Sequence, residues 1–181
     1  MTPFELSSLA LFDEVPIPDL VHLINTCPLV EFTRGETILS EGEPADRALL
    51  IVEGSMRVFA GTSGGRTMLN TVTAGSLVGE GGLMVQASMR SATLVADSYV
   101  RALEIRRKHL VALEGTEVLA TIQMSMLEST AWRLRRTQDQ MATILQKQRP
   151  PRRAATPKKQ AAAPARSGIW RSFLDALGGL T

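Results

Sequence analysis

The amino-acid sequence predicts an α+β protein in which an antiparallel β sandwich or barrel lies between helical segments. Residues 29–105 read as short β-rich segments separated by glycine-containing turns, and helical spacing of apolar residues appears only before and after them. The chain has 181 residues, of which 44% are hydrophobic, and its mean hydropathy is +0.05. These values are ordinary for a globular protein with one core and additional segments.

Two short helices are expected at the start of the chain. Residues 2–12 and 17–27 have apolar residues at helical spacing, with Leu20, Leu23 and Ile24 on one face of the second segment. Prolines at the start of that second segment suit the first turn of a helix, where no backbone N–H is needed. The β-rich region therefore begins after a helical lead.

The β-rich region is divided by turns about eight to twelve residues apart, a spacing typical of antiparallel sandwiches and barrels. The glycines that mark these turns are Gly35, Gly42, Gly54, Gly64, Gly65 and Gly75. The stretch TSGGRT, residues 62–67, predicts a hairpin tip between two apolar runs. Two further strands are expected around a turn at Asp97 and Ser98, and they continue the sheet.

After a short helix over residues 106–115, a long helix is expected from Thr116 to about Gln148, where neither glycine nor proline occurs. One set of its residues recurs at four-three spacing, the pattern of a two-stranded coiled-coil seam: Leu127, Ala131, Leu134, Gln138, Met141 and Leu145. This pattern predicts a homodimer through residues 119–145. The alternative is a helix packed across its own sheet, which would bury a different face: Leu119, Ile122, Met126 and Trp132. The two arrangements are compatible.

The C-terminal segment has two parts with different composition. Residues 149–167 are rich in proline, alanine and basic residues, which predicts a disordered linker because too little apolar surface is available to offset the entropy of ordering. Residues 168–181 regain an apolar helical face: Ile169, Trp170, Phe173, Leu174 and Leu177. A tethered amphipathic helix of this kind predicts docking to a protein partner. A membrane surface is the alternative, but the polar face of this helix is nearly neutral.

Composition excludes several classes of protein. A single cysteine, Cys27, allows no internal disulfide, and we interpret it as a small buried hydrophobe. With only His22 and His109 besides, no clustered metal ligands are expected, and neither metal nor another cofactor is implied. The sequence shows neither a membrane span nor the basic start of a signal peptide, so a cytoplasmic location is expected. No nucleophile is paired with a base, which indicates that the protein is not an enzyme.

Charge is divided unevenly along the chain. Residues 1–139 hold twelve basic and seventeen acidic residues, whereas residues 140–174 hold eight basic residues and no acidic one. A folded body that binds DNA needs a basic face, so DNA binding by the body is not expected. An alternative that remains open is nucleic-acid binding through the basic tail.

One motif carries recognisable binding chemistry: GEGGLMVQASMRSAT, residues 79–93. Glycines that let the backbone approach a ligand, together with one arginine, suit a phosphate group. A carboxylate beside a phosphate repels it unless the carboxylate accepts a hydrogen bond from a hydroxyl, so Glu80 and Arg90 together indicate a sugar phosphate. The other interpretation is that these two residues form only an ion pair that holds a loop to a strand.

Beyond this motif, residues 6–137 resemble the cyclic nucleotide-binding domain family, within the branch of the bacterial catabolite activator protein. The matching stretches are LALFDEVPIPDLVHLI, FTRGETILSEGEPADRALLIVEGSMRVF and the motif above, which corresponds to the phosphate-binding cassette of the family. The resemblance implies an antiparallel β jelly roll of the double-stranded β-helix type, flanked by N-terminal helices and a long C-terminal helix. It divides the chain into residues 1–115, 116–148, 149–167 and 168–181: the roll with its N-terminal helices, the long helix, the linker and the docking helix.

The resemblance also assigns roles to site residues. It implies that Glu80 binds the ribose 2′-hydroxyl, that Arg90 and Ser91 bind the cyclic phosphate, and that neighbouring backbone completes the cradle. That backbone belongs to Gly79, Gly81, Gly82 and Leu83. The base is expected to meet the long helix, where Thr130, Arg133 and Thr137 are candidates. The resemblance implies that the serine at position 91 favours cAMP over cGMP, but a hydroxyl at this position can also reach the amino group of guanine, so cGMP stays the alternative ligand.

Two departures from the family pattern qualify this expectation. Gly81 stands where the family has a bulky aliphatic residue, which costs helix propensity of about 1 kcal/mol relative to alanine. No helix-turn-helix sequence follows the long helix. We therefore expect a stand-alone cyclic nucleotide sensor that regulates a protein partner through its C-terminal helix and tail. The alternative is a degenerate domain that has kept the fold for protein interaction alone.

Overall fold

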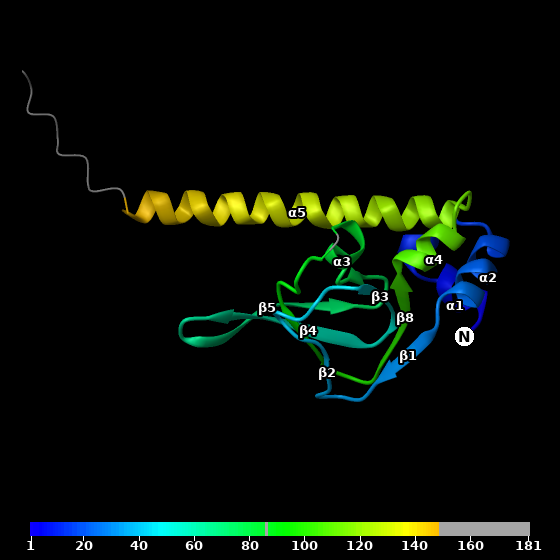
Figure 1. The fold of residues 1–181 in the computed structure, drawn as a ribbon, viewed down its shortest axis with the longest axis horizontal. Coiled ribbons are helices and arrows are strands. Elements are labelled where there is room, and N and C mark those ends of the chain that lie inside the picture. Colours follow the sequence, from blue (N-terminus) through cyan, green and yellow to red (C-terminus); the bar gives the residue numbers. More distant parts are fainter. Residues whose placement is uncertain (86, 149–181) are drawn as a thin grey trace, which may run out of the picture. The chain divides into compact units, whose positions relative to one another are not determined.

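The computed structural model of the protein describes residues 1–85 and 87–148. Contacts within the chain group it into two compact units, residues 1–136 and 137–181. The first unit contains two four-stranded antiparallel sheets and six helical segments, the last of which continues into the second unit (Figure 1). No helix in the described part of the chain is long and apolar enough to cross a membrane.

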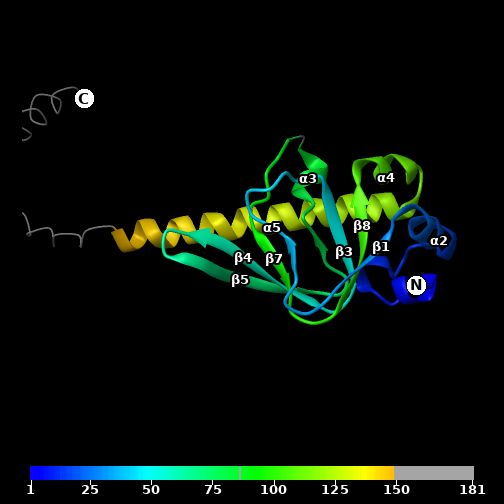
Figure 2. The same cartoon turned by 60° about the horizontal axis from the view of Figure 1, so that its bottom comes forward.

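The two sheets build a jelly roll, as the sequence predicts. The first sheet has the strand order β1 (Leu29–Phe32), β8 (Val100–Arg106), β3 (Arg47–Glu53) and β6 (Leu77–Val78). The second has the order β2 (Thr37–Leu39), β7 (Thr93–Ala96), β4 (Ser55–Thr62) and β5 (Gly65–Thr73). The hairpin of β4 and β5 turns at residues 63 and 64, where the sequence predicts a tip (Figure 2). Apart from β4 and β5, the strands that pair in the two described sheets are not consecutive in the sequence.

Strand β3 is buried on both of its faces because it belongs to two apolar cores. Leu49 and Ile51 point between the two sheets, whereas Ala48, Leu50 and Val52 pack against the helices. Alternate residues of a strand point to opposite faces, so a strand between two cores needs an unbroken apolar run. The sequence RALLIVE supplies that run.

The turn at Asp97 and Ser98 does not join strands of one sheet, as the sequence interpretation implied. Strand β7 pairs with β2 and β4, whereas β8 pairs with β1 and β3, so the chain crosses between the sheets here. The crossing packs against Gly54, whose φ is +87° and where a Cβ would lie 2.1 Å from the carbonyl oxygen of Tyr99. Glycine is therefore required at position 54.

Helices cover the outer face of the first sheet. They are α1 (Pro3–Ser7), a short 3-10 helix (Ala10–Phe12), α2 (Ile17–Thr26), α3 (Gly81–Met84), α4 (Arg107–Ala112) and α5 (Glu117–Gln148). The first expected helix is thus interrupted after Ser7. The hydroxyls of Ser7 and Ser8 donate to the carbonyls of Phe4 and Glu5, which offers the backbone groups an alternative to a longer helix.

Helix α5 begins against the helical core and continues with exposed apolar residues. Ile122 and Met126 are buried, but Trp132 is 54% exposed, so the face expected to pack on the sheet does so only in part. The large apolar residues of the coiled-coil pattern are exposed in the single chain: Leu127, Leu134, Met141 and Leu145. The homodimer therefore stays a prediction. The linker at 149–167 and the docking helix at 168–181 lie outside the described residues.

Candidate functional site

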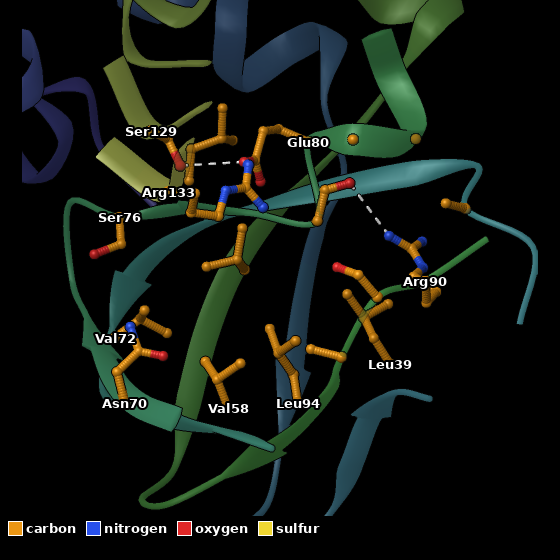
Figure 3. Close-up of a pocket in the computed structure, with 18 of the residues that line it drawn as sticks. Leu39, Val58, Asn70, Val72, Ser76, Glu80, Arg90, Leu94, Ser129 and Arg133 are labelled. Carbon is orange, nitrogen blue, oxygen red and sulfur yellow. Dashed lines mark hydrogen bonds and ion pairs between the residues drawn. The ribbon is translucent and has the colours of Figure 1, made fainter. Parts of the chain in front are cut away.

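A cavity of about 410 Å³ lies within the first unit, between the roll, the segment 79–92 and α5. Its volume falls in the range of pockets that hold small molecules. Figure 3 shows its organisation: Glu80 points toward Ser129 and Arg133, Arg90 lies at another side, and Val58, Val72 and Leu94 line the apolar part. The cavity thus combines two charged regions with an apolar wall.

Glu80 connects the cassette to helix α5. Its side chain is buried, at 3% exposure, and precedes the short helix α3. The hydroxyl of Ser129 donates to Oε1 of Glu80 at 3.1 Å, and the guanidinium of Arg133 forms an ion pair with the same oxygen. Residues 129 and 133 are four apart and therefore lie on one face of α5. The helix presents two donors to one carboxylate oxygen.

Arg90 is held by backbone carbonyls and by one carboxylate. Its Nη1 donates to the carbonyls of Arg47 at 2.8 Å and Gly79 at 3.2 Å, and its Nη2 lies 3.5 Å from Asp46 Oδ1. These bonds use three of the five guanidinium N–H donors, and no described residue takes the other two. Burial lowers the pKa of Arg90, and the charge of Asp46 opposes that shift.

Apart from His109, Glu80 and Arg90 are the only buried acidic or basic residues in the described part of the chain, with 2% and 7% of the whole residue exposed. Removing a charged group from water costs several kcal/mol, and partners repay this cost only in part. Two such groups around a single cavity therefore indicate a binding site rather than a contribution to stability.

Glycines let the backbone of the cassette approach its neighbours closely. At Gly79, where φ is +75°, a Cβ would lie 2.8 Å from Nη1 of Arg90. At Gly82 it would lie 2.6 Å from the carbonyl carbon and oxygen of Ala45. A Cβ at Gly81 would meet no atom within 4 Å, so this position has open space for a side chain.

The structure brings most of the predicted site residues to the cavity. Those that line it are Gly79, Glu80, Gly81, Gly82, Arg90, Ser91 and Arg133. Leu83 does not line it, because its side chain is 5% exposed and packs in the helical core. Thr130 is also outside the lining, since its hydroxyl donates to the carbonyl of Met126 at 2.8 Å and lies 3.8 Å from the sulfur of Met84.

Sequence reasoning missed several residues at or beside the cavity, and three of them contact or flank the predicted site residues. Ser129 and Trp132 line it from α5, and helical spacing around Arg133 would have pointed to both of them. Asp46 contacts Arg90 from the segment before β3, more than forty positions away in the sequence. No local pattern identifies such a contact, because it depends on how distant segments pair.

Residues 29–116 match the family model described as cyclic nucleotide-binding domain. This part of the chain is a cyclic nucleotide-binding domain. The matched range contains all eight strands and the cassette, whereas α5 follows it. In the described residues of the chain no cluster of three or more histidine, cysteine or acidic side chains is arranged to hold a metal ion.

The cyclic nucleotide-binding domain has relatives among bacterial regulators. A CRP-like cAMP-activated global transcriptional regulator of Mycobacterium tuberculosis is 28% identical over 141 residues, covering 77% of this chain and 62% of the relative. The chain thus spans about three fifths of that regulator. The solved N-terminal domain of a transcriptional regulator from Streptomyces coelicolor A3(2) is 28% identical, with a TM-score of 0.54, over 71% of this chain and 91% of that one.

A third protein shows the same fold at lower identity. A cyclic nucleotide-binding domain from Methylobacillus flagellatus has a TM-score of 0.65 at 21% identity, over 77% of this chain and 83% of that one. The fold expected from the sequence, an antiparallel jelly roll with flanking helices, is therefore confirmed.

Proposed function

We propose that the protein is a cyclic nucleotide sensor that binds cAMP in preference to cGMP and regulates a protein partner through α5 and the C-terminal tail. One observation carries the proposal: the cassette places a buried carboxylate and a buried guanidinium on the same cavity. A ligand with both hydroxyl and phosphate groups satisfies both charges. The relative that is activated by cAMP supports the choice of nucleotide.

In this proposal each part of the nucleotide meets a matching part of the cavity. The two donors of Arg90 that no described residue takes, together with the hydroxyl of Ser91, bind the cyclic phosphate. Both bonds from α5 end on Oε1 of Glu80, so Oε2 accepts from the ribose 2′-hydroxyl. The base then lies between the apolar wall and the face of α5 that carries Trp132.

The regulatory step proposed here is a shift in the position of α5. Ser129 and Arg133 already hold Glu80, the residue assigned to the ribose. A ligand that binds Glu80 therefore interacts differently with different arrangements of the helix, which is the requirement for a population shift. The exposed seam that includes Leu127 and Leu134 lies on a different face of α5 from the one that contacts Glu80, since 3.6 residues make one turn. A shift of α5 that changes its contacts with Glu80 therefore also moves the seam.

The output is assigned to helix α5 and to the C-terminal segment that follows it. The dimer through residues 119–145 and the docking helix at 168–181 are both proposed as carriers of the signal. The regulator from Mycobacterium tuberculosis is described as acting on transcription, whereas here the target is proposed to be a protein partner. The protein is proposed to bind and regulate rather than to catalyse, and two of the proteins reported above are described as transcriptional regulators or a domain of one.

Titration calorimetry with cAMP and cGMP tests the binding proposal. We expect micromolar affinity for cAMP, equivalent to about −8 kcal/mol, and weaker binding of cGMP. Arg90→Ala removes the buried partner of the phosphate and is expected to cost about 2–5 kcal/mol of binding free energy. Arg66→Ala serves as the control, because Arg66 is exposed on β5 and does not line the cavity.

The outcomes separate the alternatives. If Arg90→Ala binds cAMP as tightly as the wild type, the assignment of Arg90 to the phosphate is wrong. If the wild type gives no heat of binding with either nucleotide, the domain that acts only in protein interaction is favoured. A variant that ends at Arg149 tests the output, since it should still bind cAMP but lose the partner of the full chain. If nucleic acid is that partner, its affinity falls steeply with salt.

A further inference from the structure

One row of paired residues crosses the second sheet and faces the cavity. Val58 on β4 lies opposite Asn70 on β5 and opposite Leu94 on β7. Leu94 in turn lies opposite Leu39 on β2. Residues directly opposite each other in a sheet point to the same face, and all four of these residues line the cavity. The row therefore consists of three aliphatic side chains and one carboxamide.

The two ends of this row have different surroundings. At the Leu39 end, a Cβ at Gly79 would lie 3.1 Å from Leu39 and 2.8 Å from Nη1 of Arg90, so this end is beside the guanidinium. Asn70 is at the other end of the row, about 14 Å away, since neighbouring strands are a fixed distance apart. Figure 3 shows Asn70 next to Val72 and away from Arg90. A ligand whose phosphate meets Arg90 therefore extends along the row toward Asn70.

Asn70 is an unexpected residue at a half-buried position of a strand. Strand β5 is at the edge of its sheet, and Asn70 and Val72 are its only residues that are not exposed. Asparagine is depleted in strands, whereas residues such as valine suit half-buried positions. No described residue forms a hydrogen bond with the side chain of Asn70. Because a polar group that leaves water without a partner costs free energy, this carboxamide indicates a ligand group that completes its hydrogen bonds.

A β-bulge sets the place of Asn70 in the row. The pairing of β4 with β5 shifts between Val58, which lies opposite Asn70, and Phe59, which lies opposite Met68. Leu69 is therefore the extra residue on β5, and an extra residue of this kind re-aims the side chains beside it. The bulge thus marks the point on β5 at which the cavity-facing positions end.

The chemistry of the carboxamide indicates what it binds. A carboxamide presents one acceptor and one donor side by side, Oδ1 and Nδ2. Adenine presents the matching pair, because its 6-amino group donates and the adjacent ring nitrogen accepts. We propose that Asn70 is a specificity-determining residue for the base: Oδ1 accepts from the 6-amino group, and Nδ2 donates to the adjacent ring nitrogen. This inference rests on the proposed function, which places the phosphate at Arg90 and the base along the apolar wall.

Apolar contact alone gives a different expectation, and this makes the proposal testable. If the base were held only by the aliphatic residues of the wall, a leucine at the position of Asn70 would extend that wall. Such a change would leave the affinity for purine nucleotides equal or higher, whatever group the base carries at its 6-position. A hydrogen bond to the 6-amino group instead makes the affinity depend on that group, and only while Asn70 is present.

The experiment removes each member of the hydrogen-bonded pair in turn, in the full chain and by calorimetry. Asn70→Leu removes the carboxamide and keeps a side chain of similar size. The analogue purine riboside 3′,5′-cyclic monophosphate has hydrogen in place of the 6-amino group of cAMP. We expect the wild type to bind cAMP about five- to tenfold more tightly than the analogue, the usual contribution of one hydrogen bond. Asn70→Leu should bind the two nucleotides with equal affinity.

Two further variants separate recognition of the base from general effects. Asn70→Asp keeps an acceptor oxygen and loses the donor, so it should bind both anionic nucleotides more weakly but still prefer cAMP over the analogue. Thr71→Val is the matched control, which also replaces a polar side chain by an apolar one on β5. Thr71 is exposed, points to the opposite face of the strand from Asn70 and does not line the cavity. This variant should keep the preference of the wild type.

The results distinguish failure of this inference from failure of the proposed function. If the wild type binds cAMP and the analogue equally well, the role of Asn70 is wrong and the site stands. The same holds if Asn70→Leu keeps the preference for cAMP, whether or not it binds both nucleotides more weakly, or if Asn70→Asp loses that preference. Absence of cAMP binding by the wild type would overturn the proposed function together with this inference.

Discussion

The contrast between Gly81 and Gly82 gives the sharpest test of how the cassette is built. Both residues belong to α3, yet an added Cβ has open space at Gly81 and meets the carbonyl carbon and oxygen of Ala45 at 2.6 Å at Gly82. Ala45 cannot easily retreat, because its amide is bonded to the carbonyl of Ser88 at 2.8 Å. The substitution Gly82→Ala must therefore displace the cassette.

The two substitutions to alanine are expected to change cAMP affinity in opposite directions. Overpacking of this kind costs roughly 1–3 kcal/mol, so Gly82→Ala should weaken cAMP binding by about five- to hundredfold and lower the thermal unfolding midpoint. Gly81→Ala should gain up to about 1 kcal/mol of helix propensity, which allows up to about fivefold tighter binding. Calorimetry with cAMP and thermal unfolding followed by circular dichroism measure both effects. Equal affinity and equal midpoints for Gly82→Ala and the wild type would refute the reasoning.

Three further predictions concern other parts of the first unit. Arg133→Leu leaves Glu80 buried without its ion pair and should lower the free energy of unfolding by about 1–3 kcal/mol, a loss that Glu80→Gln in the same chain should partly restore in urea titrations. Burial raises the pKa of the Cys27 thiol to about 12, so the folded protein should resist thiol alkylation at pH 8. Because the thiol of the unfolded chain loses its proton at lower pH than that of the folded chain, the free energy of unfolding should fall as the pH rises from about 9 toward 12. Rapid alkylation of the folded protein at pH 8 would contradict the burial of Cys27. In a Trp170→Phe background, cAMP should change the fluorescence of Trp132, and an unchanged spectrum at saturation would place the base elsewhere.

The sequence signals for the cassette are local. The Gly-Glu pair and Arg90 lie within a short stretch, and the family resemblance placed them in order. The structure brings both side chains to one cavity. Helical spacing likewise located α5, whose bounds differ by one residue from the expected start at Thr116.

The parts that the sequence could not predict depend on pairing between distant segments. The contact between Asp46 and Arg90 arises because residues 42–46 lie beside residues 88–90, which no spacing reveals. The separation of β7 and β8 into different sheets has the same origin, since periodicity describes a strand and not its neighbours. The need for glycine at position 82 likewise follows from the backbone of Ala45.

The pairing of β1 with β8 constrains how the protein can fold during its synthesis. Leu29 lies opposite Leu103, so the first strand to leave the ribosome has no partner in its sheet until the last one emerges. Strand β2 likewise has no partner in its sheet until β7 has been synthesised. Folds dominated by such long-range contacts fold slowly, in milliseconds to seconds for small domains, because the loops must close before the contacts reward them. The nascent chain therefore carries unpaired apolar strands from the synthesis of β1 until that of β8, the interval in which chaperones are most needed.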